Sequence, residues 1–226
     1  MGYNLSIFLN KKILVYGSGR SGLSTLEFLR NKCEVFLYDD FKRNLKKSIN
    51  YKFILKNQFD FIIVSPGIDI KKCKLSKFLK KNLKKIYTDL DVFYSFYKND
   101  CITITGTNGK STTCELLYKI LLKHSYNVKL VGNIGRPILS AKNITSKTIF
   151  VVEASSYQLE YSKIFQSKYA AILNISPDHL ERHKTVNNYL RAKFKIFNSN
   201  SKNSFGFVNK KDLLTIKETK KRNLIR

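Results

Sequence analysis

One segment of the sequence, residues 101–113, has a lysine and a hydroxyl directly after a glycine-flanked loop, a spacing that suits the binding of phosphate groups. A β-branched run at 102–105 precedes the loop and an apolar periodic stretch follows Ser111, which predicts a strand, a loop and a helix in that order. The first turn of such a helix offers free backbone N–H groups and the positive end of the helix dipole. Lys110 and Ser111 stand where β and γ phosphate oxygens and Mg²⁺ would be held.

This loop is shorter than the usual phosphate-loop pattern, because Ile104 stands where that pattern has its first glycine. A Gly-Lys-Ser tripeptide alone is weak evidence. The strand before it and the helix after it favour the binding of a nucleoside triphosphate. The alternative is an ordinary strand, turn and helix without a ligand.

A second glycine loop lies near the N-terminus at residues 17–22, directly after a strand-like run and at the start of a helix-like one. Asp39 follows about twenty residues later, as in dinucleotide-binding units. The pattern requires only that the ligand places a diphosphate close to the helix start and offers a hydroxyl group to the acidic residue. A nucleotide sugar therefore satisfies it as well as NAD or FAD does. The alternative is that the glycines serve only the packing of a helix on a strand.

Two polar groups follow predicted strands of the second half of the chain. Glu153 ends an apolar run, and a carboxylate that emerges from a strand tip beside a phosphate loop is a usual Mg²⁺ ligand. Asn133 lies in a glycine-flanked loop that could hydrogen-bond a polar ligand. For Glu153, a charge at a helix N-terminus is nearly as good an interpretation.

A third polar segment, 174–183, also follows a predicted strand. Asp178 and His179 could reach a metal or order a substrate, whereas His183 is expected to be solvated on the approach to a helix. Lys193 lies in a predicted helix with several charges, so the sequence alone assigns it to a solvated face.

Strand-like and helix-like segments alternate along the chain, which predicts an α/β fold with parallel sheets. A polar joint at 98–100 separates a Rossmann-like domain at 1–97 from an incomplete P-loop-type α/β ATPase domain at 98–226. Strands are expected at 12–16, 33–38, 59–64, 86–88, 102–105, 127–131, 149–153, 170–174 and 205–209. Helices are expected at 22–29, 75–83, 89–97, 111–123, 156–165 and 186–197.

The formal net charge is +26, from 42 Lys and Arg against 16 Asp and Glu. Nucleic acid is one partner that such a charge could indicate. The lysines are spread along the whole chain, however, and the sequence is also rich in Asn, Ile, Phe and Tyr, which share A/T-rich codons with Lys. We therefore attribute the charge mainly to base composition and expect no nucleic-acid partner.

The four cysteines are scattered and form no C-x-x-C pair, which argues against a zinc site or a disulfide framework and suits a reducing cytoplasm. The sequence has no uninterrupted apolar stretch of about 18 residues, and its N-terminus lacks the pattern of a signal peptide. A cytoplasmic protein without membrane insertion is expected.

Taken together, these motifs resemble the Mur ligases, the ATP-dependent amide-forming enzymes of peptidoglycan synthesis. The resemblance runs over residues 12–209, and the shortened loop at 105–112 looks like that family's version. Segment 153–160 is most similar to the member that adds D-glutamate to UDP-N-acetylmuramoyl-L-alanine. The loop at 17–22 and the segment 65–68 also look like the UDP-sugar domain of that member.

The resemblance implies a role for each motif. Lys110 would hold the ATP phosphates, with Ser111 and Glu153 on one Mg²⁺. His179 would ligate a second Mg²⁺, and Lys193 matches the lysine that becomes carbamylated in this family and helps that metal. The loop that would bind ATP comprises Gly106, Thr107, Asn108, Gly109, Lys110, Ser111 and Thr112. The residues that would surround the UDP-sugar are Ser18, Gly19, Arg20, Ser21, Gly22, Asp39 and Gly67, with Asn133 on the muramoyl group.

The implied reaction uses UDP-N-acetylmuramoyl-L-alanine, D-glutamate and ATP, and passes through an acyl phosphate on the terminal carboxylate of the UDP-sugar substrate. A monomer is expected. Members of the family are longer, with the rest of the ATPase domain and a third, amino-acid-binding domain. We therefore expect this chain to be a truncated copy that does not form the amide bond alone.

Three other functions fit part of the sequence. A nicotinamide-dependent oxidoreductase would use the loop at 17–22 but would leave Lys110, Glu153 and His179 without a role. A polyanion-binding module would rest on the charge alone. A related Mur or folylpolyglutamate-type ligase with another substrate would use the same phosphate loop.

Overall fold

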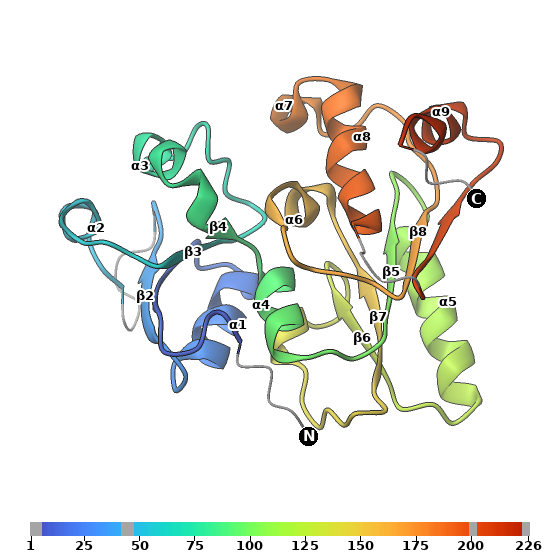
Figure 1. Cartoon of the computed structure of the whole chain (residues 1–226), viewed down its shortest axis with the longest axis horizontal. Helices are drawn as coiled ribbons and strands as arrows, with labels where there is room; N and C mark the ends of the chain where they lie inside the picture. The colour runs from blue at the N-terminus through green and yellow to red at the C-terminus, as the bar shows by residue number, and fades with distance from the viewer. Residues whose placement is uncertain (1–5, 42–47, 199–202, 223–226) are drawn as a thin grey trace. The chain divides into compact units, whose positions relative to one another are not determined.

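The computed structural model describes residues 6–41, 48–198 and 203–222, which divide into two compact units. Unit 1 contains the chain through Lys98 together with Pro137–Ser140 and Tyr161–Phe165, and unit 2 contains the remainder from Asn99 onward. Each unit is built on its own parallel β-sheet with helices packed against it (Figure 1). The α/β fold class expected from the sequence is confirmed.

The sheet of unit 1 has the strand order β2-β1-β3-β4, and all its pairings are parallel. Its strands are β1 (Lys12–Tyr16), β2 (Glu34–Tyr38), β3 (Phe61–Val64) and β4 (Ile86–Tyr87). Its helices are α1 (Arg20–Leu29), α2 (Tyr51–Lys56), α3 (Ser76–Lys81) and α4 (Asp89–Phe96), with a 3₁₀ turn η1 (Leu83–Lys85). β1 is central and nearly fully buried, as its continuous apolar run predicts.

The sheet of unit 2 has the order β6-β7-β5-β8-β9 and is also entirely parallel. Its strands are β5 (Cys101–Thr105), β6 (Val128–Gly132), β7 (Ile149–Glu153), β8 (Tyr169–Ile172) and β9 (Phe205–Val208). The helices that follow the first strands are α5 (Lys110–Lys123) and α6 (Ser156–Tyr161), and the 3₁₀ turn η2 (Ile138–Ser140) between them along the chain belongs to unit 1. The later helices are α7 (Leu180–His183), α8 (Val186–Phe194), η3 (Lys195–Phe197) and α9 (Leu213–Lys221).

The parallel arrangement brings the carboxyl ends of β5, β6, β7 and β8 to one edge of the sheet of unit 2. The loops that leave these four strands carry the polar segments that the sequence singled out. The fold therefore positions the candidate site through the ends of four strands.

The sequence pattern predicted a helix at 156–165, but α6 ends at Tyr161. Asp91, which is fully buried in α4, ends it: its Oδ1 accepts hydrogen bonds from the Ser162 hydroxyl at 2.9 Å and from the backbone N–H groups of residues 163, 164 and 165 at 2.8–3.1 Å. A carboxylate that gathers several N–H groups draws the chain out of the helix. Residues 161–165 therefore pack in unit 1.

The expected helix at 186–197 is also shorter, because α8 ends at Phe194 and continues as the 3₁₀ turn η3. Three of the described α-helices were not predicted, α2, α7 and α9. α2 and α9 begin at a capping side chain, since Asn50 accepts from the N–H of Phe53 at 2.8 Å and Asp212 from that of Thr215 at 3.1 Å.

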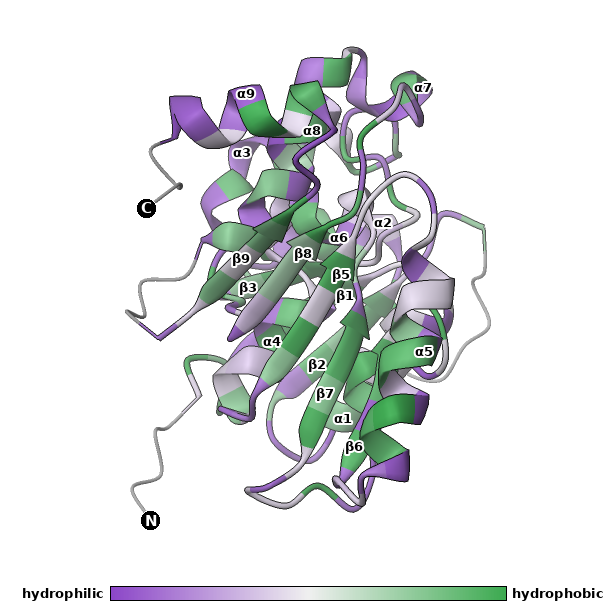
Figure 2. Cartoon of the chain, turned by 90° about the vertical axis from the view of Figure 1, so that its right-hand side faces the viewer, coloured by the Kyte–Doolittle hydropathy of each residue, from purple (hydrophilic) through white to green (hydrophobic). Residues whose placement is uncertain are grey.

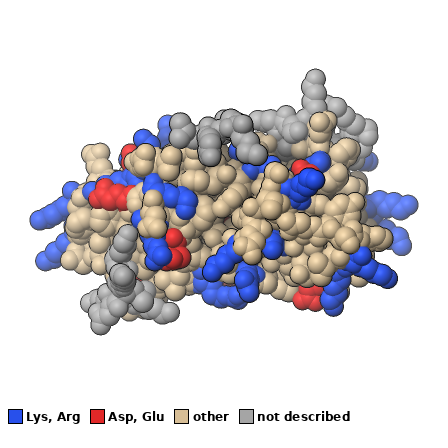
Figure 3. All heavy atoms as spheres, turned by 90° about the horizontal axis from the view of Figure 1, so that it is seen from below, with Lys and Arg blue, Asp and Glu red and all other residues tan. Residues whose placement is uncertain are grey.

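Two further observations concern the surface of the described residues. None of their helices is both long and apolar enough to cross a membrane. On the face seen in Figure 3, lysine and arginine side chains form separate groups with apolar and neutral residues between them.

Candidate phosphate and metal site

The loop between β5 and α5 is shaped by two glycines. Gly109 has a φ of +80°, in the left-handed region, and directly precedes the first turn of α5. Gly106 has a φ of +156°, and a Cβ there would lie 3.2 Å from the Cβ of Leu173. The loop therefore runs close to the end of β8, and the residues Lys110, Ser111 and Thr112 open α5 as the sequence predicted.

Asn174, which was not among the predicted site residues, holds this loop in place. The side-chain oxygen of Asn174 accepts from the N–H of Asn108 at 2.9 Å, and its amide donates to the carbonyl of Asn108 at 3.1 Å. Thr107 adds a second connection, since its hydroxyl donates to the carbonyl of Ser176 and accepts from its N–H at 3.0 Å. These hydrogen bonds therefore hold the loop at two points. The only sign of the Asn174 contact in the sequence was that this residue lies at the end of a predicted strand.

Glu153 is a buried carboxylate at the tip of β7, with 1% of its surface exposed. Its Oε2 accepts from the hydroxyl of Ser111 at 2.8 Å, and its Oε1 accepts from the side-chain amide of Asn133 at 2.7 Å. Gly132 permits this approach, because its φ is +111° and a Cβ there would lie 2.3 Å from the carbonyl oxygen of Glu153. The structure thus brings together three residues that the sequence placed at or beyond the ends of three different strands.

Lys110 lies over its own loop, where its Nζ donates to the carbonyl of Thr107 at 2.7 Å. The ammonium group is therefore beside the backbone N–H groups that open α5. A positive side chain and a helix N-terminus at one point form a favourable site for an anion.

Lys193 is buried, with 1% of its surface exposed, contrary to the solvated position that the sequence alone suggested. Its Nζ donates to the carbonyl of Gly106 at 2.8 Å and to the hydroxyl of Thr105 at 3.2 Å, and it lies 4.6 Å from the centre of the Tyr189 ring. Burial, and next the nearby Lys110 ammonium, lower the pKa of Lys193 to about 7. This burial could not be predicted from the sequence, because the helix that carries Lys193 contains several charged residues.

His179 lies beside the site on the turn that opens α7, with a left-handed φ of +53°. Its Nε2 is 3.4 Å from the Oδ2 of Asp178, and its ring centre is 4.9 Å from that of Tyr157. Tyr189 links it to the buried lysine, since the Tyr189 ring lies 6.2 Å from His179 and also faces Lys193.

His183 is also buried, so the expectation that it is solvated is wrong. Its Nε2 lies 3.0 Å from the hydroxyl of Ser156, and its ring stacks against Tyr157 at 5.6 Å. Burial lowers the pKa of His183 and favours the neutral imidazole. The short helix α7 turns this side chain inward, which the spacing of the histidines did not indicate.

In the part of the chain that the structure describes, no group of three or more His, Cys, Asp or Glu side chains gathers at metal-binding spacing. The candidate metal residues instead include a serine hydroxyl and a lysine amine. Ser111 and Glu153 are in direct contact, whereas His179 and Lys193 are joined through Tyr189.

The glycine loop of unit 1 has a different construction. Two of its three glycines are required by packing, since a Cβ at Gly22 would lie 1.8 Å from the carbonyl oxygen of Gly17, and one at Gly17 would lie 2.8 Å from Ser65. The Oδ2 of Asp39 accepts from both the N–H and the hydroxyl of Ser18, at 2.8 and 2.7 Å. The acid therefore contacts the loop itself.

The other residues assigned to the UDP-sugar lie in or near this loop. Gly19 caps α1 with an extended backbone, and Arg20 and Ser21 form the first turn, where the Ser21 carbonyl accepts from the hydroxyls of Ser24 and Thr25. A Cβ at Gly67 would meet nothing within 4 Å. Their contact with a UDP-sugar stays a prediction.

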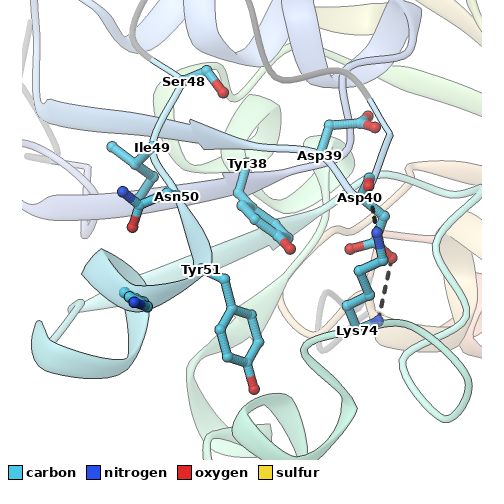
Figure 4. Close-up of a pocket in the computed structure, with 9 residues that line it drawn as sticks. Tyr38, Asp39, Asp40, Ser48, Ile49, Asn50, Tyr51 and Lys74 are labelled. Carbon is cyan, nitrogen blue, oxygen red and sulfur yellow. Dashed lines mark hydrogen bonds between the residues drawn. The ribbon is translucent and has the colours of Figure 1, made fainter.

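A cavity of about 750 Å³ lies beside this loop in unit 1, at the end of β2 (Figure 4). At the edge of the cavity Asp40 contacts β1 and the loop after β3, since its carboxylate accepts from the Tyr16 hydroxyl at 2.8 Å and from the N–H of Lys74 at 3.2 Å. The Nζ of Lys74 also donates to the carbonyl of Asp40 at 2.8 Å. The cavity is lined by Tyr38, Asp39, Asp40, Ser48, Ile49, Asn50, Tyr51, Lys52 and Lys74.

The fold and the site define a parallel α/β protein with a shortened phosphate loop backed by a buried carboxylate. The sequence profile of the Mur ligase middle domain matches residues 104–225, more than half of the chain. The chain belongs to the Mur ligase family.

Curated relatives agree with this assignment. The chain is 39% identical over 215 residues to the UDP-N-acetylmuramoylalanine–D-glutamate ligase of Rickettsia bellii, with 91% of this chain and 47% of that protein covered. It is 34% identical to the ligase of the same name from Caldicellulosiruptor saccharolyticus, with 91% of this chain and 49% of that protein covered. The chain thus spans about half the length of the curated relatives it matches.

A solved structure shares the fold. The UDP-N-acetylmuramate:L-alanyl-gamma-D-glutamyl-meso-diaminopimelate ligase from Neisseria meningitides matches with a TM-score of 0.59 and 13% identity, over 94% of this chain and 75% of that one. At this identity the match supports the fold alone.

Proposed function

We propose that the chain provides the UDP-sugar-binding and ATP-binding parts of an ATP-dependent ligase that joins D-glutamate to UDP-N-acetylmuramoyl-L-alanine. Both curated relatives bear the name of that activity. The substrates, the monomeric state and a cytoplasmic location belong to this proposal.

The contact of Glu153 with Ser111 and Asn133 carries the proposal. It joins the first turn of α5, a strand-tip carboxylate and a polar side chain from the loop after a third strand at 2.7–2.8 Å. An ordinary strand, turn and helix has no need for a buried carboxylate at this point. A nucleotide-dependent enzyme needs one to hold the cation that accompanies the phosphates.

The residues present fit Mg²⁺ at the first position, because the Ser111 hydroxyl and the Glu153 carboxylate are hard oxygen donors. When bound there, Mg²⁺ would neutralise charge on the transferred phosphoryl group. Lys110 and the N–H groups of the loop would hold the phosphate oxygens. The terminal carboxylate of the UDP-sugar substrate would be phosphorylated, and the amine of D-glutamate would displace phosphate from that acyl phosphate.

The second metal position would use His179 and Lys193. An amine is a poor Mg²⁺ ligand, but a buried lysine with a pKa near 7 is available as the neutral nucleophile. Its nitrogen would attack CO₂, forming an N–C bond and releasing one proton, and the resulting carbamate would offer oxygen donors. In unit 1, Ser18–Gly22, Asp39 and Gly67 would bind the UDP group, and Asn133 would contact the muramoyl part.

Calorimetric titration of the 226-residue chain tests the proposal. Mg·ATP and UDP-N-acetylmuramoyl-L-alanine are each expected to bind with a stoichiometry of one, and NADH is expected not to bind. Binding of NADH without binding of the UDP-sugar would contradict the proposal and favour the oxidoreductase alternative.

A further inference from the structure

The short helix α7 begins at His179, one of the two residues proposed for the second metal position. In Figure 2 the strands of unit 2 point toward the end of this unit where α7 lies. The carbonyl of His179 accepts from the backbone N–H groups of Arg182 and His183 at 3.1 and 3.0 Å. The place of the His179 imidazole therefore depends on how α7 is held.

α7 has little internal support. It contains four residues, and the residues on both sides of it have a positive φ, +53° at His179 and +70° at Lys184. Residues with a side chain adopt this backbone conformation at a cost, and they keep it only where the surrounding structure fixes them. Contacts between α7 and its neighbours must therefore provide that fixation.

Arg182 ties α7 to α6 through an ion pair. Its Nε donates to Oε2 of Glu160 at 2.9 Å, and the two side chains are only 7% and 17% exposed. The guanidinium group also lies 5.1 Å from the centre of the Tyr157 ring, so two groups of α6 fix it. Glu181 and His183, on either side of Arg182, contact α6 as well. A charge-assisted hydrogen bond that is shielded from water is directional and strong, which suits the fixing of a short turn.

The same ion pair lies close in the chain to the first metal position. α6 begins three residues after Glu153, the carboxylate proposed for the first metal. The contact of Arg182 with Glu160 thus joins the helix that follows Glu153 to the turn that carries His179. Groups that orient a metal ligand from behind strengthen metal binding by about ten- to a hundredfold.

We propose that Arg182 and Glu160 are positioning residues, which hold α7 against α6 and so keep the His179 imidazole at the second metal position. Both act through the backbone of α7 and are not themselves metal ligands. This inference rests on the proposed function, because it assigns His179 to the second metal.

Binding of Mn²⁺, a paramagnetic substitute for Mg²⁺, tests the inference in the 226-residue chain with a non-hydrolysable ATP analogue and bicarbonate present. The wild type is expected to bind two Mn²⁺ ions. His179→Asn is expected to bind one, since asparagine tolerates the positive φ but has no imidazole. Electron paramagnetic resonance counts the bound ions.

The decisive variant is Arg182→Met/Glu160→Leu. It removes both charges together, so neither is left buried without its partner, and the variant is expected to fold. It should keep the first Mn²⁺ ion and bind the second about tenfold or more weakly than the wild type.

Arg222→Met/Glu218→Leu is the matched control. The Nε of Arg222 also donates to a glutamate of unit 2, Glu218 at 2.7 Å, but this pair belongs to α9 and not to the α6–α7 contact. Both Mn²⁺ ions are expected to bind as in the wild type. If Arg182→Met/Glu160→Leu binds the second Mn²⁺ ion as tightly as this control does, the inference is overturned.

A second measurement separates this inference from the proposed function. If the wild type itself binds only one Mn²⁺ ion, the second metal position is contradicted, and amide hydrogen exchange then tests the role of the ion pair alone. The amides at positions 182 and 183 donate to the His179 carbonyl. They are expected to exchange about tenfold or more faster in Arg182→Met/Glu160→Leu than in the wild type, since the turn opens more often. Unchanged exchange would overturn the inference whichever metals bind.

Discussion

The two glycine loops of this molecule follow the same plan, a buried parallel strand that turns into a helix, but their surroundings differ. In the loop of unit 1, Asp39 accepts hydrogen bonds from the N–H and hydroxyl of Ser18. In the loop of unit 2, the acid Glu153 instead contacts the hydroxyl of Ser111 in the helix, and Lys110 lies over the loop.

This difference separates two kinds of phosphate chemistry. A loop that is tied to its own acid and has no lysine within it can seat a diphosphate that does not react. A loop followed by a lysine, with a hydroxyl and a carboxylate in contact, can hold phosphate oxygens and a cation together, as phosphoryl transfer requires. Glycine spacing alone does not distinguish the two.

The largest effect is expected at Gly22, where the unit 1 loop is tightest. Gly22→Ala places a Cβ 1.8 Å from the carbonyl oxygen of Gly17, so unit 1 should lose about 3 kcal/mol of stability or fail to fold. Gly19→Ala is the matched control, since its Cβ would meet nothing within 4 Å. Denaturant unfolding of both variants checks this, and equal stability of the two would contradict the packing role.

Another large effect concerns Lys193 and pH. The folded-state pKa of about 7 lies below that of an unfolded lysine, near 10.4. Between these values the unfolded state binds more protons, so this group makes stability rise with pH, by up to about 1.4 kcal/mol per pH unit.

Lys193→Met removes that contribution. The difference in unfolding free energy between the wild type and this variant should therefore change steadily in favour of the wild type from about pH 7 to pH 10. Lys195→Met, at a neighbouring lysine, is the control. A difference that is independent of pH would show that the amine of Lys193 is not held neutral by burial.

How far the sequence predicts this structure is clearest in the same two loops. The strands, the glycine turns and the helix starts follow from local patterns, and the contact of Ser111 with Glu153 follows from strand tips that share one edge. The early end of α6 and the inward position of His183 do not follow. They depend on Asp91 and on Ser156, which are distant in sequence from the groups they contact, and no local pattern encodes such partners.

The burial of Lys193 has the same origin. Its helix shows mixed charges, and only the closeness of α8 to the end of β5 removes this one amine from water. The Mur ligase resemblance singled out the residue, but its environment comes from the tertiary structure.

A smaller effect is expected at Glu153, and it concerns unit 2 alone. Glu153→Gln retains the size of the side chain. Its NH₂ group, however, places a second hydrogen-bond donor against the amide of Asn133 or the hydroxyl of Ser111. Mg·ATP affinity should fall by about tenfold, the value of one charge-assisted contact. Glu115→Gln, on the exposed side of α5, is the control, and an equal loss in both variants would argue against a metal-binding role.

The smallest effect is expected at Ser18. Ser18→Ala removes the hydroxyl that donates to Asp39 at 2.7 Å but leaves the backbone N–H bond, so unit 1 should lose about 1 kcal/mol. ATP binding by unit 2 should be unaffected. Thermal unfolding measured with and without ATP checks both parts, and a loss of ATP binding would contradict the separation of the two loops.

We propose that the loop at Gly106–Ser111 binds ATP phosphates through Lys110. The most direct measurement is the Mg·ATP dissociation constant of Lys110→Ala beside that of Lys119→Ala, an exposed lysine on the same helix. Loss of the ammonium should weaken Mg·ATP binding by about a hundredfold, as expected for strong charge-assisted contacts, and Lys119→Ala should bind like the wild type. Equal affinities in the two variants would contradict the account.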